Sequence, residues 1–269
     1  MCCHRTSGTE FIIMRKLYHI FIFLFVLVAP AHVQADLTQT IKNIKPSIVG
    51  VGTIQPTRAP KSLFMGTGFV VGDGQYVVTN AHVLPEILDY EKNEKLAVFL
   101  PATGNQITGL IVKKIAVDKH HDLALLKLTN ARLPALELAK DENVLEGKRY
   151  AFTGFPVGMI IGLTPVTHEG IVSAITPIVI PAQNSGKLNP TIIKRQRNPY
   201  HVYQLDATAY PGNSGSPLYD IKSGKVVAVI NKVFVKESKE AVLKDPSGIT
   251  YAIPVKYVKA LLDQTGKAN

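Results

Sequence analysis

Short apolar stretches, separated by turns rich in glycine and proline, run through most of the chain. Alternating or β-branched stretches of strand length lie at 47–54, 66–71, 76–79, 96–100, 106–118, 123–128, 150–156, 166–175, 201–207, 225–231 and 248–254. Strands at this spacing predict an all-β sandwich or barrel rather than alternating strands and helices. The sequence therefore predicts about five or six short strands in each half of the chain.

Other patterns occupy three short regions. Apolar residues at 255, 258, 261 and 262 have helical spacing, so a helix is predicted near the C-terminus. The mixed stretch 37–45 is compatible with a short helix that ends before Pro46. Residues 55–65 are rich in proline and lysine and are predicted to form a loop.

The first 35 residues have the pattern of an export signal. A basic start at 14–16 precedes the apolar run Ile20–Ala29, and small or aliphatic residues end this region at Ala35. The apolar run is about 10–13 residues long, shorter than the roughly 20 that a membrane-spanning helix needs. Cleavage after Ala35 is therefore favoured over a retained anchor. Residues 1–13 fit neither role, which makes Met14 an alternative start to Met1.

Charge and cysteine content exclude several classes of function. The chain has 30 Lys and Arg against 20 Asp and Glu, a net charge of +10. These charges are scattered apart from a cluster at 194–197, and no nucleic-acid motif accompanies them, so no nucleic-acid partner is expected. Cys2 and Cys3 precede the predicted cleavage site, which excludes a thiolate metal site in the mature chain. No cofactor or metal motif is visible, so none is expected.

Residues 212–218, Gly-Asn-Ser-Gly-Ser-Pro-Leu, are the first candidate for chemistry. Glycines allow backbone conformations that can aim the N–H groups of Gly212 and Ser214 at one point, as an oxyanion hole requires. The same residue types also form ordinary turns. The motif therefore needs a base and an orienting acid elsewhere in the chain.

His82 and Asp122 are the candidates for those two roles. His82 follows the predicted strand 76–79, and Asp122 begins an apolar strand, where a partly buried carboxylate needs partners. Taken singly, His82 can be structural and Asp122 can cap a turn. The order His82, Asp122, Ser214, with spacings of 40 and 92 residues, is that of chymotrypsin-like enzymes. Together the three signals predict a catalytic triad.

The chain resembles trypsin-like serine proteases of the HtrA/Deg family. The matching segments are GTGFVV (66–71), VTNAHV (78–83), HDLALLKL (121–128), TGFPVGM (153–159), EGIVSAI (169–175), LDATAYPGNSGSPL (205–218) and GITYAIP (248–254). The resemblance implies two six-stranded antiparallel β-barrels of the chymotrypsin-like kind, with the active site between them. The N-terminal barrel is expected in 36–148, after a cleaved leader at 1–35, and the C-terminal barrel and helix in 149–269.

The same resemblance assigns roles to the triad. It implies that Ser214 attacks a peptide carbonyl and that His82 transfers the proton. Asp122 would orient the histidine, and the N–H groups of Gly212 and Ser214 would hold the oxyanion. The expected activity is that of an exported serine endopeptidase, periplasmic or secreted, acting on unfolded or damaged proteins.

The resemblance also places residues of the substrate site. Thr208 stands where trypsin carries an aspartate, and Ala209 stands where the family usually has isoleucine. Cleavage after medium aliphatic residues is therefore expected, rather than after Lys or Arg. Val229, Ile230 and Asn231 lie on the strand expected to pair with the substrate backbone, with Val229 in place of a usual glycine.

Several departures from the family pattern are visible. Ser216 replaces a second glycine, as in secreted glutamyl endopeptidases, but the pocket histidine of that rival family is missing from 229–231. Residues 177–199 are longer than usual in a region where the family has a regulatory loop. The chain ends soon after the predicted helix, so the PDZ domain that commonly follows is expected to be absent.

Two classes of function remain. The first is the endopeptidase, with protein or peptide substrates and no stable membrane anchor after signal cleavage. The second is a non-catalytic, chaperone-like peptide-binding protein on the same fold. The presence of all three triad residues favours the enzyme. Assembly as a homo-oligomer, such as a trimer, stays open.

Overall fold

The computed structural model describes residues 36–101, 107–140, 144–156, 162–178, 199–231 and 249–266. The elements of the first half are α2 (Leu37–Ile44), the 3₁₀ helix η1 (Lys45–Ser47), β1 (Ile48–Ile54), β2 (Ser62–Val71), β3 (Tyr76–Asn80), the 3₁₀ helix η2 (Ala81–Val83), β4 (Lys95–Phe99), β5 (Gly109–Asp118) and β6 (Leu123–Leu128). Those of the second half are β7 (Arg149–Gly154), β8 (Val166–Pro177), β9 (His201–Asp206), β10 (Pro217–Asp220), β11 (Val226–Asn231), β12 (Ile249–Pro254) and α6 (Val255–Gln264).

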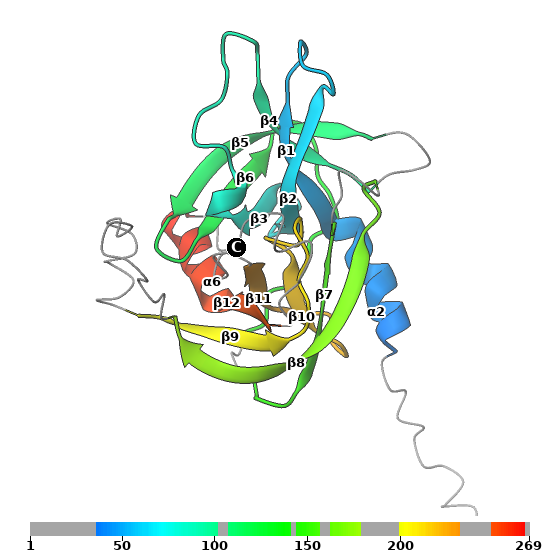
Figure 1. Cartoon of the computed structure of the whole chain (residues 1–269), viewed down its shortest axis with the longest axis vertical. Helices are drawn as coiled ribbons and strands as arrows, with labels where there is room; N and C mark the ends of the chain where they lie inside the picture. The colour runs from blue at the N-terminus through cyan, green and yellow to red at the C-terminus, as the bar shows by residue number, and fades with distance from the viewer. Residues whose placement is uncertain are drawn as a thin grey trace, which may run out of the picture. The chain divides into compact units, whose positions relative to one another are not determined.

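The strands form two closed barrels (Figure 1). The order is β1-β2-β3-β6-β5-β4 in the first barrel and β10-β11-β12-β9-β8-β7 in the second. All pairings between named strands are antiparallel. This confirms the predicted fold class, two six-stranded antiparallel β-barrels with a C-terminal helix.

Strands β1, β3 and β6 of the first barrel are buried on both faces, which explains their continuous apolar sequences. In β3, Val77 packs with the cluster around Val49 and Leu126, while its neighbour Val78 packs with Phe69 and the second barrel's Tyr219. Successive side chains of a strand point to opposite faces. One face therefore fills the first barrel, and the other belongs to a core that the two barrels share.

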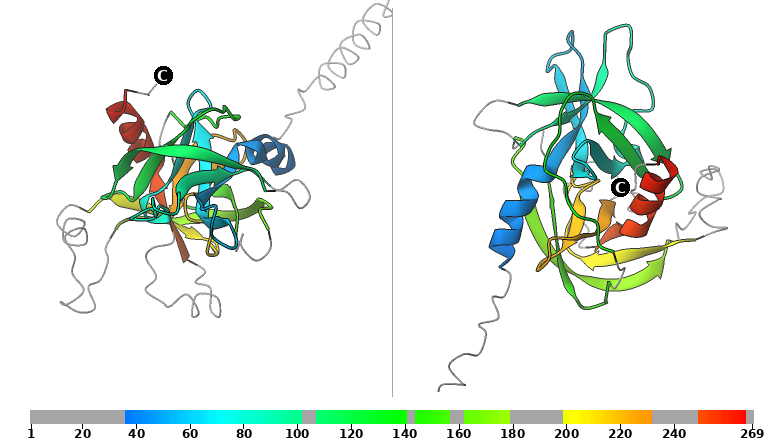
Figure 2. Two further views of the ribbon diagram at one scale, coloured as in Figure 1. Left: turned by 90° about the horizontal axis from the view of Figure 1, so that it is seen from above. Right: turned by 180° about the vertical axis from the view of Figure 1, so that it is seen from behind.

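The segment 129–140 fastens the barrels to each other. Leu136 donates its backbone N–H to Val70 of β2 at 2.8 Å, and Ala139 donates to Val226 of β11 at 2.8 Å. Helix α6 contacts β5 and β6 of the first barrel as well as β11 and β12 of the second (Figure 2). Its buried residues are the four predicted from their spacing, Val255, Val258, Leu261 and Leu262.

The structure differs from the predicted elements at strands β2 and β10. Strand β2 begins at Ser62, within the predicted loop 55–65, because Ser62–Phe64 continue the pairing with β1 beyond an irregularity at Val51/Gly52. Strand β10 was not predicted because its four residues follow the glycine-rich motif directly. Most of 177–199 and all of the leader 1–35 lie outside the described residues. Within the described ranges, no helix combines the length and apolar character needed to cross a membrane.

Candidate active site

The pairing of β3 with β6 brings His82 and Asp122 together. Asn80 lies opposite Leu123 in this pair, so η2 and the turn before β6 leave the barrel side by side. The Nδ1 atom of His82 lies 2.6 Å from Oδ2 of Asp122. The backbone N–H of His82 donates to Oδ1 of the same carboxylate at 2.9 Å. Both oxygens of Asp122 therefore hold the histidine.

The backbone of Asp122 is held in an uncommon conformation. Its φ is 55°, in the left-handed region that aspartate occupies more readily than most side chains. Its carbonyl oxygen accepts hydrogen bonds from the Ala81 N–H at 3.1 Å and from Nδ2 of Asn80 at 3.0 Å. These bonds fix the turn from which the carboxylate points at His82.

Asp122 is 5% exposed, so its carboxylate depends on protein partners. The third of these comes from the other barrel: Nδ2 of Asn231, at the end of β11, donates to Oδ2 at 2.8 Å. With three donors on its two oxygens, the buried carboxylate is well satisfied. Asn231 is also one of the residues predicted for the substrate site, and its side chain contacts Asp122.

Ser214 lies in a loop that is fastened to β11. The φ angles of Gly212 and Gly215 are 99° and 88°, a backbone conformation that glycine adopts far more readily than other residues. The Gly215 N–H donates to the Ile230 carbonyl at 3.0 Å, and the Ile230 N–H donates to the Ser216 carbonyl at 2.8 Å. This pair of bonds fixes the backbone on the C-terminal side of Ser214.

Thr67 of β2 connects the serine loop to the first barrel. Its N–H donates to the Ser214 carbonyl at 2.9 Å, and its hydroxyl donates to the Gly212 carbonyl at 2.6 Å. The same hydroxyl oxygen accepts the Phe155 N–H at 3.0 Å. Sequence reasoning missed Thr67, although one signal was available, namely a hydroxyl between two glycines in an apolar strand.

Position 66, directly before Thr67, has no room for a side chain, because Val83 and the serine loop both approach its backbone closely. A Cβ built on Gly66 would lie 2.7 Å from a methyl carbon of Val83 and 3.1 Å from the Ser214 carbonyl oxygen. Gly66 thus sits between the helical turn that carries His82 and the loop that carries Ser214. The described interactions include no hydrogen bond between the Ser214 hydroxyl and the His82 ring. Such bonds are often long in structures without substrate.

The peptide unit between Gly212 and Asn213 is held at both ends. Its carbonyl oxygen accepts from Thr67, and its N–H donates to the Tyr210 carbonyl at 3.0 Å. Among the described interactions, the N–H groups of Gly212 and Ser214 donate no hydrogen bond. These are the two donors that the sequence nominated for an oxyanion hole.

Behind the loop lies a buried polar cluster that sequence reasoning did not foresee. Asn213 and Ser216 are fully buried, and within the described structure their side-chain polar atoms have no hydrogen-bond partner. A Cβ built on Gly154 of β7 would lie 2.0 Å from the Ser216 hydroxyl and 2.9 Å from Oδ1 of Asn213. The glycine at 154 is therefore required by Ser216, the residue that departs from the family pattern.

The predicted specificity residues have different surroundings. Thr208 is half-buried, whereas Ala209 is buried and packs with the core of the second barrel. The hydroxyl of Thr250 accepts the Ala209 N–H at 3.0 Å and donates to the Ala207 carbonyl at 2.6 Å. Strand β12 therefore holds the backbone of this segment in place.

Val229 and Ile230, two further residues of the predicted substrate site, lie in the interior of the protein. Both are fully buried, and their side chains belong to the cores of the protein. Strand β11 has neighbours on both edges, β10 and β12, and the backbone groups of Ile230 are bonded to the serine loop. The expectation from the resemblance, that this strand pairs with the substrate backbone, stays a prediction.

His168 of β8 is a second residue that the sequence did not single out. Its ring stacks on Phe152 with a centroid distance of 4.9 Å and lies 5.9 Å from the Tyr210 ring. Burial lowers the pKa of His168. Its Nε2 atom is buried and has no hydrogen-bond partner among the described residues. The described residues contain no group of three or more His, Cys, Asp or Glu that could hold a metal ion.

Comparison with known proteins agrees with this geometry. Residues 66–229 match the trypsin-like peptidase domain family. A probable periplasmic serine endoprotease DegP-like of Chlamydia muridarum is 31% identical over 216 residues, 78% of this chain and 35% of the relative. Its counterpart in Halomonas elongata is 28% identical over 200 residues, 74% of this chain and 35% of the relative.

More distant relatives extend the match. A serine protease HtrA-like of Staphylococcus aureus is 25% identical over 249 residues, 86% of this chain and 29% of the relative. The solved structure of the HtrA-type protease AlgW with a tripeptide has the same fold, with a TM-score of 0.60 over 85% of this chain and 63% of that chain, at 23% identity. The chain spans about a third of the length of the curated relatives it matches. It belongs to the trypsin-like peptidase domain family and is similar to the HtrA and DegP serine proteases.

Proposed function

We propose that the protein is an exported serine endopeptidase that cleaves peptide bonds through a Ser214–His82–Asp122 triad. The observation that carries the proposal is the double contact between Asp122 and His82, through the ring at 2.6 Å and the backbone at 2.9 Å. A carboxylate that accepts from Nδ1 leaves Nε2 as the basic atom of the ring. The imidazole is then ready to take a proton from a serine hydroxyl.

The mechanism follows from these roles. The Ser214 oxygen attacks the substrate carbonyl carbon while Nε2 of His82 removes its proton. The protonated ring is stabilised by Asp122 and passes the proton to the leaving amine, which leaves an acyl group on Ser214. Water then attacks the acyl-enzyme by the same route, with His82 again acting first as base and then as acid.

The oxyanion is held by the N–H groups of Gly212 and Ser214. Their lack of acceptors in the described structure supports this role, because a preorganised donor is most effective when it has no competing partner. Removing one such donor typically costs about 10²–10³-fold in kcat. Thr67 keeps the loop in this arrangement through the Gly212 carbonyl.

The substrates are proteins or peptides, in particular unfolded or damaged ones in the periplasm or outside the cell. The names of the DegP-like relatives support the compartment. In this proposal residues 1–35 are the cleaved leader, followed by the barrels of 36–148 and 149–269. Thr208 and Ala209 form the wall of a pocket for medium aliphatic side chains. The absence of a carboxylate at either position argues against cleavage after Lys or Arg.

Turnover of an unfolded protein tests the proposal. Carboxymethylated casein is incubated with the wild type and with Ser214→Ala, and the products are identified by mass spectrometry. The wild type should produce new ends after aliphatic residues, and Ser214→Ala should produce none. Equal binding of casein by both proteins without any cleavage would instead support the non-catalytic alternative.

A further inference from the structure

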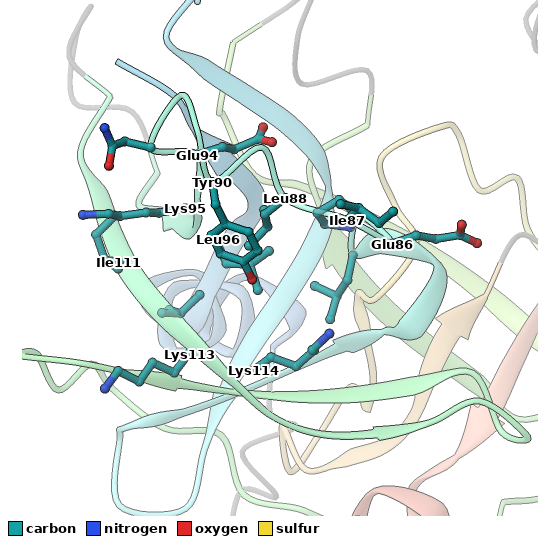
Figure 3. Close-up of a pocket in the computed structure, with 14 residues that line it drawn as sticks. Glu86, Ile87, Leu88, Tyr90, Glu94, Lys95, Leu96, Ile111, Lys113 and Lys114 are labelled. Carbon is teal, nitrogen blue, oxygen red and sulfur yellow. The ribbon is translucent and has the colours of Figure 1, made fainter. Parts of the chain in front are cut away.

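The first barrel carries a groove, and the first residue along the chain that lines it is Leu84, two positions after His82. The groove has a volume of about 670 Å³ and lies between the segment 84–94 and strands β4 and β5. Leu84, Leu96 and Val112 are buried and form its apolar floor. Figure 3 shows Tyr90, Leu88 and Leu96 at the centre of the groove, with lysine side chains around them.

The groove exposes large apolar side chains that face solvent. Ile87 is 84% exposed, Tyr90 is 76% exposed and Ile111 is 39% exposed. All three line the same groove. Single exposed apolar residues are ordinary, but a contiguous group around a concave surface is typical of a binding site.

The segment that presents Ile87 and Tyr90 is held in place. Glu94 accepts the Asp89 N–H at 3.1 Å and the Thr53 hydroxyl at 2.6 Å, and it pairs with Arg58 at 2.7 Å. Asp89 in turn accepts the Lys92 N–H at 3.1 Å. The exposed side chains therefore project from a preorganised backbone, which reduces the entropic cost of binding.

The charge around the groove is positive. Lys95, Lys113 and Lys114 line it, and in the described part of the chain none of them forms a salt bridge. Of the two carboxylates in the lining, Glu94 is already paired with Arg58 and only Glu86 has no salt bridge within the described residues. Three ammonium groups thus face one unpaired carboxylate, which favours an acidic occupant.

We propose that this groove is a secondary binding site for an apolar segment of the polypeptide substrate with acidic residues beside it. The inference rests on the proposed function, because the occupant is the substrate of the proposed endopeptidase and the segment 84–94 beside the groove follows His82 in the chain. A second copy of this chain is a poorer occupant, because its net positive charge opposes the lysines.

Binding measurements on protein that carries Ser214→Ala test this site without turnover. The probe is a fluorescent 12-residue peptide with Leu, Val and Ile at its centre and Asp and Glu on both sides, and fluorescence anisotropy gives its Kd. One test variant combines Ile87→Ser with Tyr90→Ser, and the other combines Lys113→Glu with Lys114→Glu. The control combines Ile115→Ser with Val117→Ser, which are exposed on the same strand but do not line the groove.

Each test variant should weaken binding of the acidic peptide by about tenfold, while the control binds like the parent. A peptide with Lys in place of Asp and Glu should bind more weakly, and salt should remove most of that difference. On a background with Ser214 intact, the test variants should raise KM for casein and leave hydrolysis of a tripeptide ester unchanged.

Equal Kd values for the two test variants and the control would overturn the groove as a peptide site. Self-association that is lost in Ile87→Ser/Tyr90→Ser, with peptide binding unchanged, would overturn it in favour of a second copy. Failure of the proposed function looks different. An intact protein that binds the peptide through the groove but never cleaves casein would refute the endopeptidase and with it the assignment of the occupant as a substrate.

Discussion

The hydroxyl of Thr67 donates a hydrogen bond of 2.6 Å to the carbonyl oxygen of Gly212. This bond connects the first barrel to the serine loop of the second barrel. Because the adjoining N–H of Asn213 is bonded to Tyr210, this contact fixes the plane of the peptide next to the proposed oxyanion hole. The two barrels therefore contribute jointly to the site, beyond supplying separate members of the proposed triad.

Replacing Thr67 by valine tests that connection. Thr67→Val removes the donor to Gly212 and leaves the Phe155 N–H without its acceptor, a loss of about 1–3 kcal/mol for a buried group. We expect kcat/KM to fall by about 10–100-fold, mostly in kcat, because loop orientation matters most in the transition state. Thr67→Ser keeps the hydroxyl and should retain most of the activity. Equal activity of the valine and serine variants would contradict the role.

The contact between Asn231 and Asp122 predicts a graded loss of activity. Asn231→Leu removes one donor from a buried carboxylate, and a hydrogen bond to a charged group contributes about 1.5–3 kcal/mol. We expect about a 10–100-fold fall in kcat. Asp122→Asn removes the charge beside His82 and should lower kcat by about 10⁴-fold, as in other triads. Steady-state kinetics on one peptide substrate gives both values, and a larger loss in Asn231→Leu than in Asp122→Asn would refute this ranking.

Gly154 and Ser216 form a pair that can be tested by rescue. In Gly154→Ala the new Cβ would lie 2.0 Å from the Ser216 hydroxyl, so the serine loop has to move. We expect the variant to lose activity by at least about tenfold and to be less stable by about 1–3 kcal/mol. Adding Ser216→Gly removes the closest contact and should restore part of both. Rescue stays partial because Oδ1 of Asn213 remains 2.9 Å from the same carbon.

The contact between Asp118 and His121, close to Asp122 in the chain, gives a prediction for pH. Burial favours the neutral carboxyl of Asp118, but hydrogen bonds from the ring and backbone of His121, and its charge, outweigh this and lower the pKa of Asp118 to about 2. The His121 ring also stacks on Tyr257 of α6 at 3.9 Å, so the pair helps to hold the C-terminal helix.

The folded-state pKa of Asp118 is below its ordinary value of 3.8, so the pair stabilises the fold above that pH and loses its effect as the pH falls towards 2. After allowance for partial exposure, Asp118→Asn should lower the free energy of unfolding by about 1 kcal/mol at pH 7. The difference from the wild type should shrink between pH 4 and pH 2 in urea titrations. Asp73→Asn, in an exposed pair with Arg132, is the control and should have little effect at either pH.

Sequence patterns predicted an all-β sandwich or barrel because most of the strands leave a local signature, and the resemblance to the HtrA/Deg family implied the two six-stranded barrels. Apolar runs ended by turn residues located eleven of the strands, and helical spacing located α6. Strand β10 was missed because its four residues merge with the glycine-rich motif. Residues 62–65 were read as loop because only the pairing with β1, which depends on contacts far along the chain, makes them a strand.

For the site, the sequence identified the residues with distinctive chemistry and missed those that act through long-range contacts. His82 and Asp122 could be paired because their order along the chain with Ser214 is that of chymotrypsin-like enzymes. The position of Asn231 beside Asp122, 109 residues away, depends on how the two barrels pack. The same packing buries Val229, whose type alone gave no sign of which face it occupies.

Covalent labelling of Ser214 tests the central claim most directly. The protein is treated with a fluorophosphonate probe, and mass spectrometry of the digested product locates the adduct, with Ser214→Ala and Asp122→Asn treated in parallel. We predict one adduct on Ser214 in the wild type, none in Ser214→Ala and strongly slowed labelling in Asp122→Asn. A folded wild-type protein that stays unlabelled, even with unfolded protein present, would contradict the assignment of Ser214 as the nucleophile.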